Sequence, residues 1–150
     1  MTANKNKEVK LEFKITKIEL LEKTFSVPVL DKDNLPDVQF DLAINLNIDK
    51  ENKKISNILH VTIRLDNNTE ALAGITVACI FDIINFEDII ISSGDSVTIP
   101  DSIIDTLNII SIGTTRGIMF NEFKGTWLHN SILPVIDPQS FKIAAAEKND

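Results

Sequence analysis

Strict alternation of apolar and polar residues from Val38 to Asp49 constrains the fold of this chain most strongly. Every second position in this run carries a large apolar side chain, namely Val38, Phe40, Leu42, Ile44, Leu46 and Ile48. A period of two is that of a β-strand, because successive side chains point to opposite faces of a sheet. The run therefore predicts a strand with one face on a core and the other in water.

Three further segments also read as strands. Apolar residues alternate from Val9 to Ile15 and then change phase before Ile18 and Leu20, which predicts a β-bulge at Thr16 or Lys17. A third strand is predicted over residues 55–65. A fourth, over 70–84, is apolar on both faces and is therefore expected to be central. Polar turns separate the strands, with a Pro- and Asp-rich connection over 28–36, so we expect a four-stranded antiparallel meander.

A long helix is predicted over residues 100–121. Thr98 and Asp101 have the spacing of a capping box, with Pro100 just inside the helix start. The helix is apolar around most of its circumference, and one sheet can cover only one side. The other apolar sides of the helix would be covered either by loops of the same chain or by a second subunit. We favour a subunit interface formed by Ile103, Leu107, Ile110, Thr114 and Gly117, with the glycines at 113 and 117 permitting close helix packing.

Residues 125–138, here called the crossover, are too apolar for an ordinary solvated loop. Their prolines oppose a continuous helix, so they are expected to pack across the domain or to offer Trp127, Leu128, Ile132, Leu133 and Ile136 to a partner. A short C-terminal helix is predicted over 138–147, with Asp137 as its N-cap. The fold class is thus α+β, a single domain over 1–150 with residues 1–8 and 148–150 expected to be disordered.

Composition limits the partners and the compartment. The net charge of −7 opposes binding to nucleic acid or to an anionic lipid surface, because both would repel the chain. The lone Cys79 suits a reducing compartment, and no signal peptide is recognisable, so a cytosolic protein is expected. Asp105, Asn108 and Arg116 interrupt the most apolar stretch, residues 103–120, and oppose membrane insertion.

Motifs that would indicate an enzyme are missing from the sequence. His60 and His129 stand in no metal-ligand spacing, and no nucleophile motif occurs. The segment from Gly113 to Gly117 lacks the Gly-Lys-Ser/Thr ending of a phosphate loop. We therefore expect a protein that binds other polypeptides, with no catalytic residues, metal or cofactor.

Several short strings, in order and spacing, resemble the bacterial export chaperone SecB and its SecB-like relatives. The string Leu35-Pro36-Asp37-Val38-Gln39-Phe40-Asp41-Leu42 is similar to the family's P-D-V-x-L-D-L at the second strand. Ile80-Phe81 falls where the family has G-I-F. Lys124-Gly125-Thr126 and the later Leu133-Pro134-Val135-Ile136-Asp137-Pro138 resemble its R-G-T-F-P-x-L-x-L-x-P-V-N-F crossover. The resemblance covers residues 13–145.

This resemblance implies a homotetramer, a dimer of dimers, that holds unfolded polypeptides in apolar grooves without ATP. In the family the groove lies between the sheet and the crossover. Its walls would here be Phe40, Leu42, Ile44 and Phe81, and its lid Trp127, Leu128, Ile132 and Leu133, with Ile136 as a further groove residue.

The resemblance also raises the question of partners. Family members that deliver clients to the motor SecA dock it through acidic residues on the outer sheet face. Glu22 matches one of these positions, but Ser26 and Gly74 stand where the others are expected. SecB-like proteins also serve toxin-antitoxin modules, with an aggregation-prone antitoxin as client, and this chain could belong there. A small-ligand binder or an enzyme on a similar fold is a further alternative, which a deep polar pocket would favour.

Overall fold

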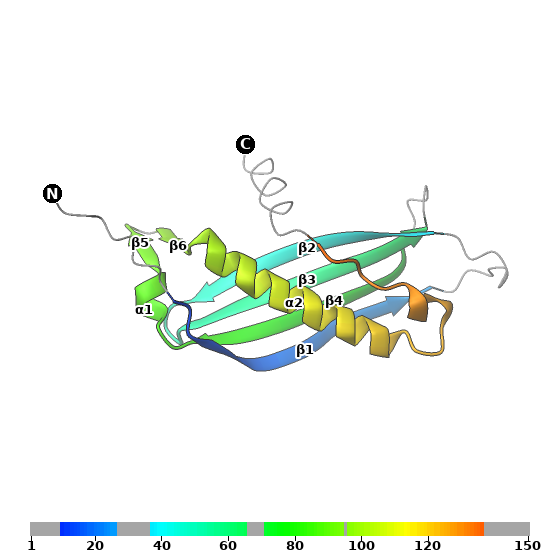
Figure 1. Cartoon of the computed structure of the whole chain (residues 1–150), viewed down its shortest axis with the longest axis horizontal. Helices are drawn as coiled ribbons and strands as arrows, with labels where there is room; N and C mark the ends of the chain where they lie inside the picture. The colour runs from blue at the N-terminus through cyan, green and yellow to red at the C-terminus, as the bar shows by residue number, and fades with distance from the viewer. Residues whose placement is uncertain (1–9, 27–36, 66–70, 95, 137–150) are drawn as a thin grey trace.

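A twisted antiparallel sheet forms one layer of the molecule and a long helix crosses one of its faces (Figure 1). The computed structural model describes residues 10–26, 37–65, 71–94 and 96–136. The four strands of the main sheet are β1 (Phe13–Phe25), β2 (Val38–Asp49), β3 (Lys54–Leu65) and β4 (Ala71–Ile83). The helix α2 (Asp101–Glu122) lies within one residue of the predicted span at each end. The α+β class is confirmed.

The strand order is β1-β4-β3-β2, which corrects the predicted meander. Strands β2, β3 and β4 follow one another as expected, but β1 pairs with β4 and not with β2. The chain between Phe25 and Val38 can reach from one edge of the sheet to the other, because a residue spans up to about 3.3 Å and neighbouring strands lie about 4.8 Å apart. The prediction that β4 is a central strand is confirmed, and β1 and β2 form the two edges.

The two edge strands differ in regularity. In β1 the register shifts between Ile15 and Lys17, which confirms the predicted bulge, and shifts again between Leu20 and Glu22, which the sequence did not indicate. β2 pairs with β3 without a register shift from Val38 to Asp49. Regular pairing keeps the six large apolar side chains of β2 on the face that carries α2.

A small subdomain connects β4 to α2. It consists of α1 (Phe86–Ile89) and a hairpin of β5 (Ile91–Ser93) and β6 (Ser96–Thr98). The predicted capping box is wrong. Pro100 occupies the N-cap position and no side chain caps the helix, while the Thr98 hydroxyl donates to the Ile91 carbonyl within the hairpin, 3.4 Å away. The Thr98 side chain is thus hydrogen-bonded within the hairpin and does not cap α2.

One polar cluster interrupts the apolar layer between sheet and helix. The fully buried Asn57 of β3 donates through Nδ2 to Asn108 Oδ1 at 3.0 Å and to Ser111 Oγ at 3.2 Å. Cys79 lies opposite Asn57 on β4, and burial raises the pKa of its thiol, while hydrogen bonds to Ser111 and Thr114 oppose that shift. A buried thiol of this kind fits a packing role.

The crossover begins with the short helix η1 (Trp127–Asn130) and continues through residues 131–136. Figure 1 shows it running back along α2, on the side of the helix where β2 lies. The expectations for residues 1–8, for the C-terminal helix over 138–147 and for residues 148–150 lie outside the described residues. In the described part of the chain, no helix is both long enough and apolar enough to span a membrane.

Candidate polypeptide-binding surface

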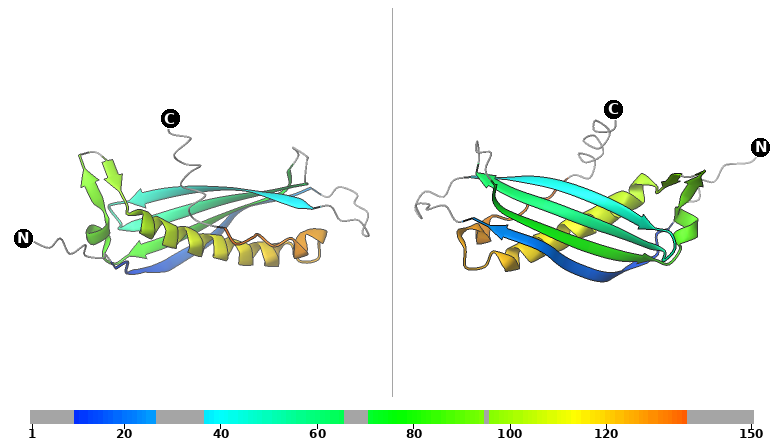
Figure 2. Two further views of the ribbon diagram at one scale, coloured as in Figure 1. Left: turned by 45° about the horizontal axis from the view of Figure 1, so that its top comes forward. Right: turned by 180° about the vertical axis from the view of Figure 1, so that it is seen from behind.

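The apolar side of β2 is only half covered. Its six apolar side chains, called here the β2 face, pack against the core but remain half-buried: Val38, Phe40, Leu42, Ile44, Leu46 and Ile48. Five of the six matching positions of β3, by contrast, are fully buried, and only Leu65, opposite Val38, is half-buried. The difference arises because β2 is an edge strand and α2 crosses the middle of the sheet (Figure 2). Phe40, Leu42 and Ile44, the predicted groove walls, therefore lie together at a partly open edge.

The crossover carries exposed apolar side chains beside this edge. Ile132 is 56% exposed and Val135 is 93% exposed, while Trp127 and Ile136 are half-buried against the core. The Trp127 Nε1 atom is buried and finds no acceptor among the described residues. Val135 was not among the predicted groove residues, although its place in the same apolar string would have indicated it.

Three predicted groove residues lie inside the core. Phe81 is central in the sheet, and Leu128 and Leu133 of the crossover are buried as well. Leu133 is 1% exposed, so residues 131–136 are held against the domain at this point. The nine predicted residues thus divide into six partly open or half-buried positions and these three buried ones.

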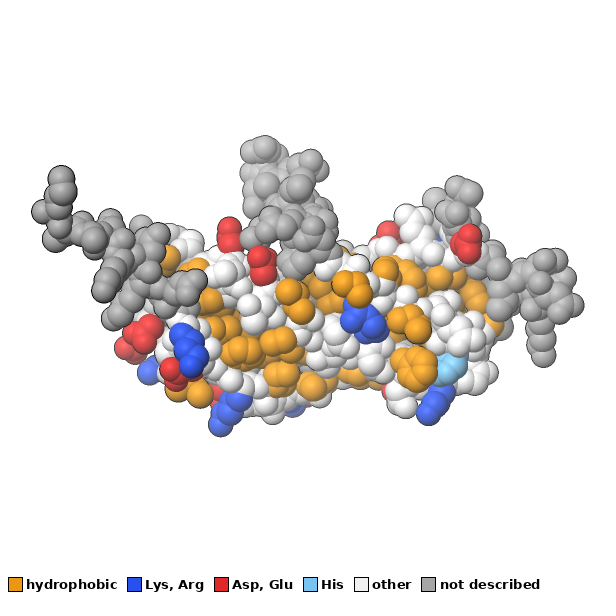
Figure 3. Space-filling model, viewed as in Figure 1, with side chains coloured by type: hydrophobic (Ala, Val, Ile, Leu, Met, Phe, Trp, Pro, Cys, Tyr) orange, Lys and Arg blue, Asp and Glu red, His pale blue; other side chains and the backbone are white. Residues whose placement is uncertain are grey.

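Four of the five residues of the predicted interface stripe of α2 do not lie on its outer face. Ile103 and Leu107 point at the sheet and belong to the core of their own chain, Ile110 and Thr114 are half-buried, and Gly117 is exposed. The outer face instead carries Ile109, Gly113 and Phe120, with Ile109 53% exposed. Figure 3 shows apolar side chains spread over this side of the molecule, with few charges among them. Because apolar residues surround most of α2, the sequence pattern did not indicate which side of the helix packs against the sheet.

The two glycines of α2 are in open space. A Cβ added at Gly117 would meet nothing within 4 Å, and one at Gly113 would meet only Nη1 of Arg116 at 3.9 Å. Close packing at these glycines therefore does not occur within the described chain. They remain available to a second helix.

A second apolar strip lies along β1. Ile15, Ile18 and Leu20 are exposed, and their partners in β4 are the core residues Phe81, Cys79 and Val77. They therefore share the face that carries α2. The sequence pattern predicted the strand but gave no sign that α2 would leave this flank uncovered.

The predicted motor-docking positions lie together near one end of the outer sheet face. Glu22 is opposite Thr76, and Thr24 is opposite Gly74, while the amide of Ser26 donates to the Leu72 carbonyl at 2.7 Å. The same face also carries basic side chains paired with acidic ones, including Lys54 with Asp82 and Arg64 with Asp41. Positive and negative groups are thus mixed, and the face is not a uniformly acidic surface.

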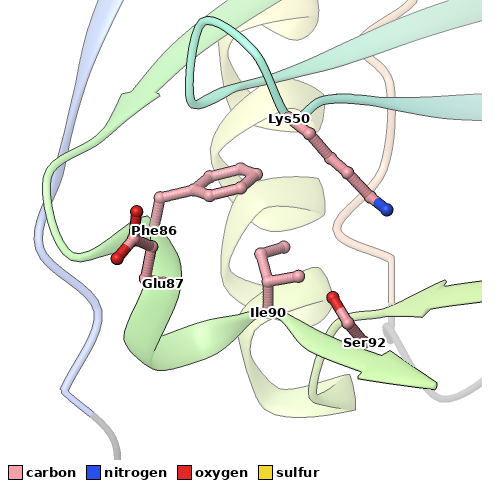
Figure 4. Close-up of a pocket in the computed structure, with 5 residues that line it drawn as sticks. All are labelled: Lys50, Phe86, Glu87, Ile90 and Ser92. Atoms are coloured by element: carbon pink, nitrogen blue, oxygen red, sulfur yellow. The ribbon is translucent and has the colours of Figure 1, made fainter. Parts of the chain in front are cut away.

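A shallow depression of about 200 Å³ lies at the other end of the sheet, beside α1 (Figure 4). It is lined by Lys50, Phe86, Glu87, Ile90 and Ser92. Figure 4 shows the Lys50 ammonium and the Glu87 carboxylate on opposite sides of it. These charges do not converge on one point, as the polar groups of a small-molecule site usually do. Among the residues that the structure describes, no three His, Cys, Asp or Glu side chains group as metal ligands would.

Comparison with known proteins identifies the fold. No family model matches the chain, and no curated protein does. A protein of unknown function from Streptococcus agalactiae is 11% identical, with a TM-score of 0.43 over 86% of this chain and 100% of that one. A SecB-like chaperone from Mycobacterium tuberculosis, solved in complex with a ChAD peptide from an antitoxin, is 14% identical, with a TM-score of 0.53 over 83% of this chain and 85% of that one. The chain therefore has a SecB-like fold, as its sequence strings had indicated.

Proposed function

We propose that this protein is an ATP-independent chaperone of the holdase type, which binds unfolded or aggregation-prone polypeptides on the β2 face and the crossover. The half-covered β2 face beside exposed crossover side chains is the observation that carries this proposal. Unfolded polypeptides have exposed apolar side chains in common and no shared sequence, and burial of apolar surface is a non-directional force that suits such clients. The SecB-like fold supports the same role.

The β2 face suits an extended client. Apolar side chains repeat at every second residue of β2, which is also the period at which an extended client presents side chains to one surface. Each buried client side chain of the size of Leu or Phe contributes about 1.5–3 kcal/mol. Several such contacts provide useful affinity without a nucleotide-driven step.

An aggregation assay tests this proposal directly. Equimolar protein is expected to suppress light scattering by a reduced, unfolded client, equally with and without ATP. Trp127 fluorescence is expected to change on binding, because its indole lies half-buried at the start of the crossover. Unchanged client aggregation at all protein ratios would contradict the proposal.

We further propose that the chain assembles as a dimer of dimers. The exposed apolar residues on the outer face of α2 and along β1 support this, because contiguous apolar patches on soluble domains mark interaction sites. Two-fold contacts between identical faces close on themselves and leave no unpaired surface for further growth.

A dedicated antitoxin chaperone is the second candidate. Two observations favour it over an export role. The SecB-like neighbour was solved with a peptide from an antitoxin. In addition, the outer sheet face here has Glu22 but neutral residues at 26 and 74. An acidic docking face attracts a basic partner through charge, so its loss weakens association more than it alters client binding.

Binding to SecA is therefore expected to be weak in the unmodified protein and to increase in a variant carrying Ser26→Glu and Gly74→Glu. Gly74 has no positive φ, but an added Cβ would lie 2.9 Å from Thr24 Oγ1, so Thr24→Ala belongs in the same variant. The matched control carries Gln at 26 and 74 with the same Thr24→Ala. Sedimentation or interferometry at low salt measures the gain, which 0.5 M salt is expected to remove. Tight, salt-insensitive SecA binding by the unmodified chain would favour the export role.

A further inference from the structure

Arg116 ties the crossover to α2. Its Nε donates to the carbonyl oxygen of Leu133 at 2.7 Å, and its Nη2 donates to the carbonyl oxygen of Pro134 at 3.0 Å. The planar guanidinium thus bridges two consecutive peptide carbonyls. Hydrogen bonds from a charged donor are roughly twice as strong as neutral ones. The missing side chain at Gly113 leaves the space beside the guanidinium open, since Nη1 would lie 3.9 Å from a Cβ there.

The start of the crossover has its own anchors. The Thr126 hydroxyl donates to the Phe123 carbonyl at 2.7 Å, and the same oxygen accepts a hydrogen bond from the Leu128 amide. The ring centroids of His129 and Phe120 lie 4.4 Å apart. These contacts fix η1 to the end of α2. A displacement of residues 131–136 from the domain would therefore pivot after η1 and would break the two bonds from Arg116.

The bonds hold one particular side chain in place. Leu133, whose carbonyl accepts the first bond, fills a core position with 1% of its surface exposed, whereas Ile132 and Val135 face outward. Moving residues 131–136 away from the domain withdraws Leu133 and breaks both bonds. The described arrangement is thus a closed one, in which the crossover occupies core space beside the half-covered β2 face.

We propose that Arg116 is a positioning residue for client binding, a latch that sets how readily the crossover leaves the domain. This inference rests on the proposed chaperone function. Release of the latch frees Leu133 and its apolar neighbours to contact a client and uncovers the core space that Leu133 fills. Arginine suits this role better than lysine, because the planar guanidinium presents its N–H groups to two carbonyls in a fixed geometry, whereas the ammonium is a point charge on a flexible stem.

The experiment compares Arg116→Gln and Arg116→Lys with the parent protein. The control Lys124→Gln removes the same charge from an exposed residue near the end of α2. Hydrogen exchange at residues 132, 133, 135 and 136 is expected to be about tenfold or more faster in Arg116→Gln, and less so in Arg116→Lys, with little change in α2. Stopped-flow Trp127 fluorescence is expected to show client association faster by several-fold, with dissociation little changed, because the client binds the released form. The control is expected to match the parent in both measurements.

The possible results distinguish failure of the proposed role of Arg116 from failure of the proposed chaperone function. Unchanged exchange in the crossover would overturn the latch. Faster exchange with parental client rates would show a structural contact that client binding does not use, and would likewise overturn the proposal while the chaperone function stands. If the parent binds no client, the chaperone function fails and the proposed role of Arg116 with it, while exchange still reports on the contact. Should Arg116→Gln not fold, Arg116→Lys provides the same comparison.

Discussion

Leu42→Gln is expected to remove most of the aggregation-suppressing activity. Leu42 lies in the middle of the β2 face, half-buried, and opposite Val61 of β3. Glutamine has a similar length but places a polar amide where a client side chain would be buried. Losing one apolar contact of this size costs about 1.5–3 kcal/mol, which corresponds to a dissociation constant about 10- to 150-fold higher. Titration of a labelled unfolded client measures the change.

Ala43→Gln provides the matched control. Ala43 is the next residue of the same strand, exposed on the opposite face and opposite His60. The same side chain is thus added to the same strand, but away from the β2 face. This variant is expected to suppress aggregation as the parent does, and thermal unfolding confirms that both variants fold. Equal activity of folded Leu42→Gln and Ala43→Gln would contradict the assignment of the β2 face as the binding surface.

Leu107→Ala is expected to lower the free energy of unfolding by about 2–5 kcal/mol, the usual cost of truncating a large core residue. Leu107 has no exposed surface and faces the sheet. Truncation leaves a cavity that the closely packed layer fills only in part. Urea denaturation at a fixed protein concentration measures the loss.

Ile109→Ala, two residues further along the same helix, is expected to behave in the opposite way. Ile109 is 53% exposed on the outer face of α2, so within one chain its truncation costs no more than about 0.5 kcal/mol. If α2 pairs with a second copy, the variant instead reduces the mass measured by light scattering at low micromolar concentration. A parent protein that stays monomeric would contradict the dimer of dimers. Loss of folding in Ile109→Ala with an intact Leu107→Ala would reverse the assignment of core and outer face.

The strands were predictable because their signal is local. Alternation in β2 and apolar character on both faces of β4 follow directly from side-chain periodicity, and the bulge at Thr16 follows from a change of phase. Strand order was not predictable in the same way. A long connection between β1 and β2 permits either edge, and the choice of β4 as the partner of β1 depends on non-local pairing.

The candidate binding surface was predictable in kind but not in detail. An apolar strand face and an apolar crossover were visible in the sequence, and Phe40, Leu42, Ile44 and Ile132 are partly open in the structure. Periodicity could not show that Leu128 and Leu133 would turn inward while Val135 turned outward, because an irregular segment has no fixed period. The orientation of α2 was hidden for a related reason, since apolar residues surround it. The position of Arg116 beside two crossover carbonyls depends on tertiary structure alone.

The contact of Asn57 with Asn108 and Ser111 has a consequence for how sequences of this fold diverge. Apolar layers tolerate exchange among Leu, Ile and Val and small sliding of a helix, because dispersion contacts have little directionality. A buried amide does not tolerate such changes, because loss of a hydrogen-bond partner leaves a polar group unpaired at a cost of about 1–3 kcal/mol. Residues 57, 108 and 111 should therefore change together among homologues, either all polar or all apolar. Such joint substitution would indicate that these three residues fix the position of α2 along the sheet.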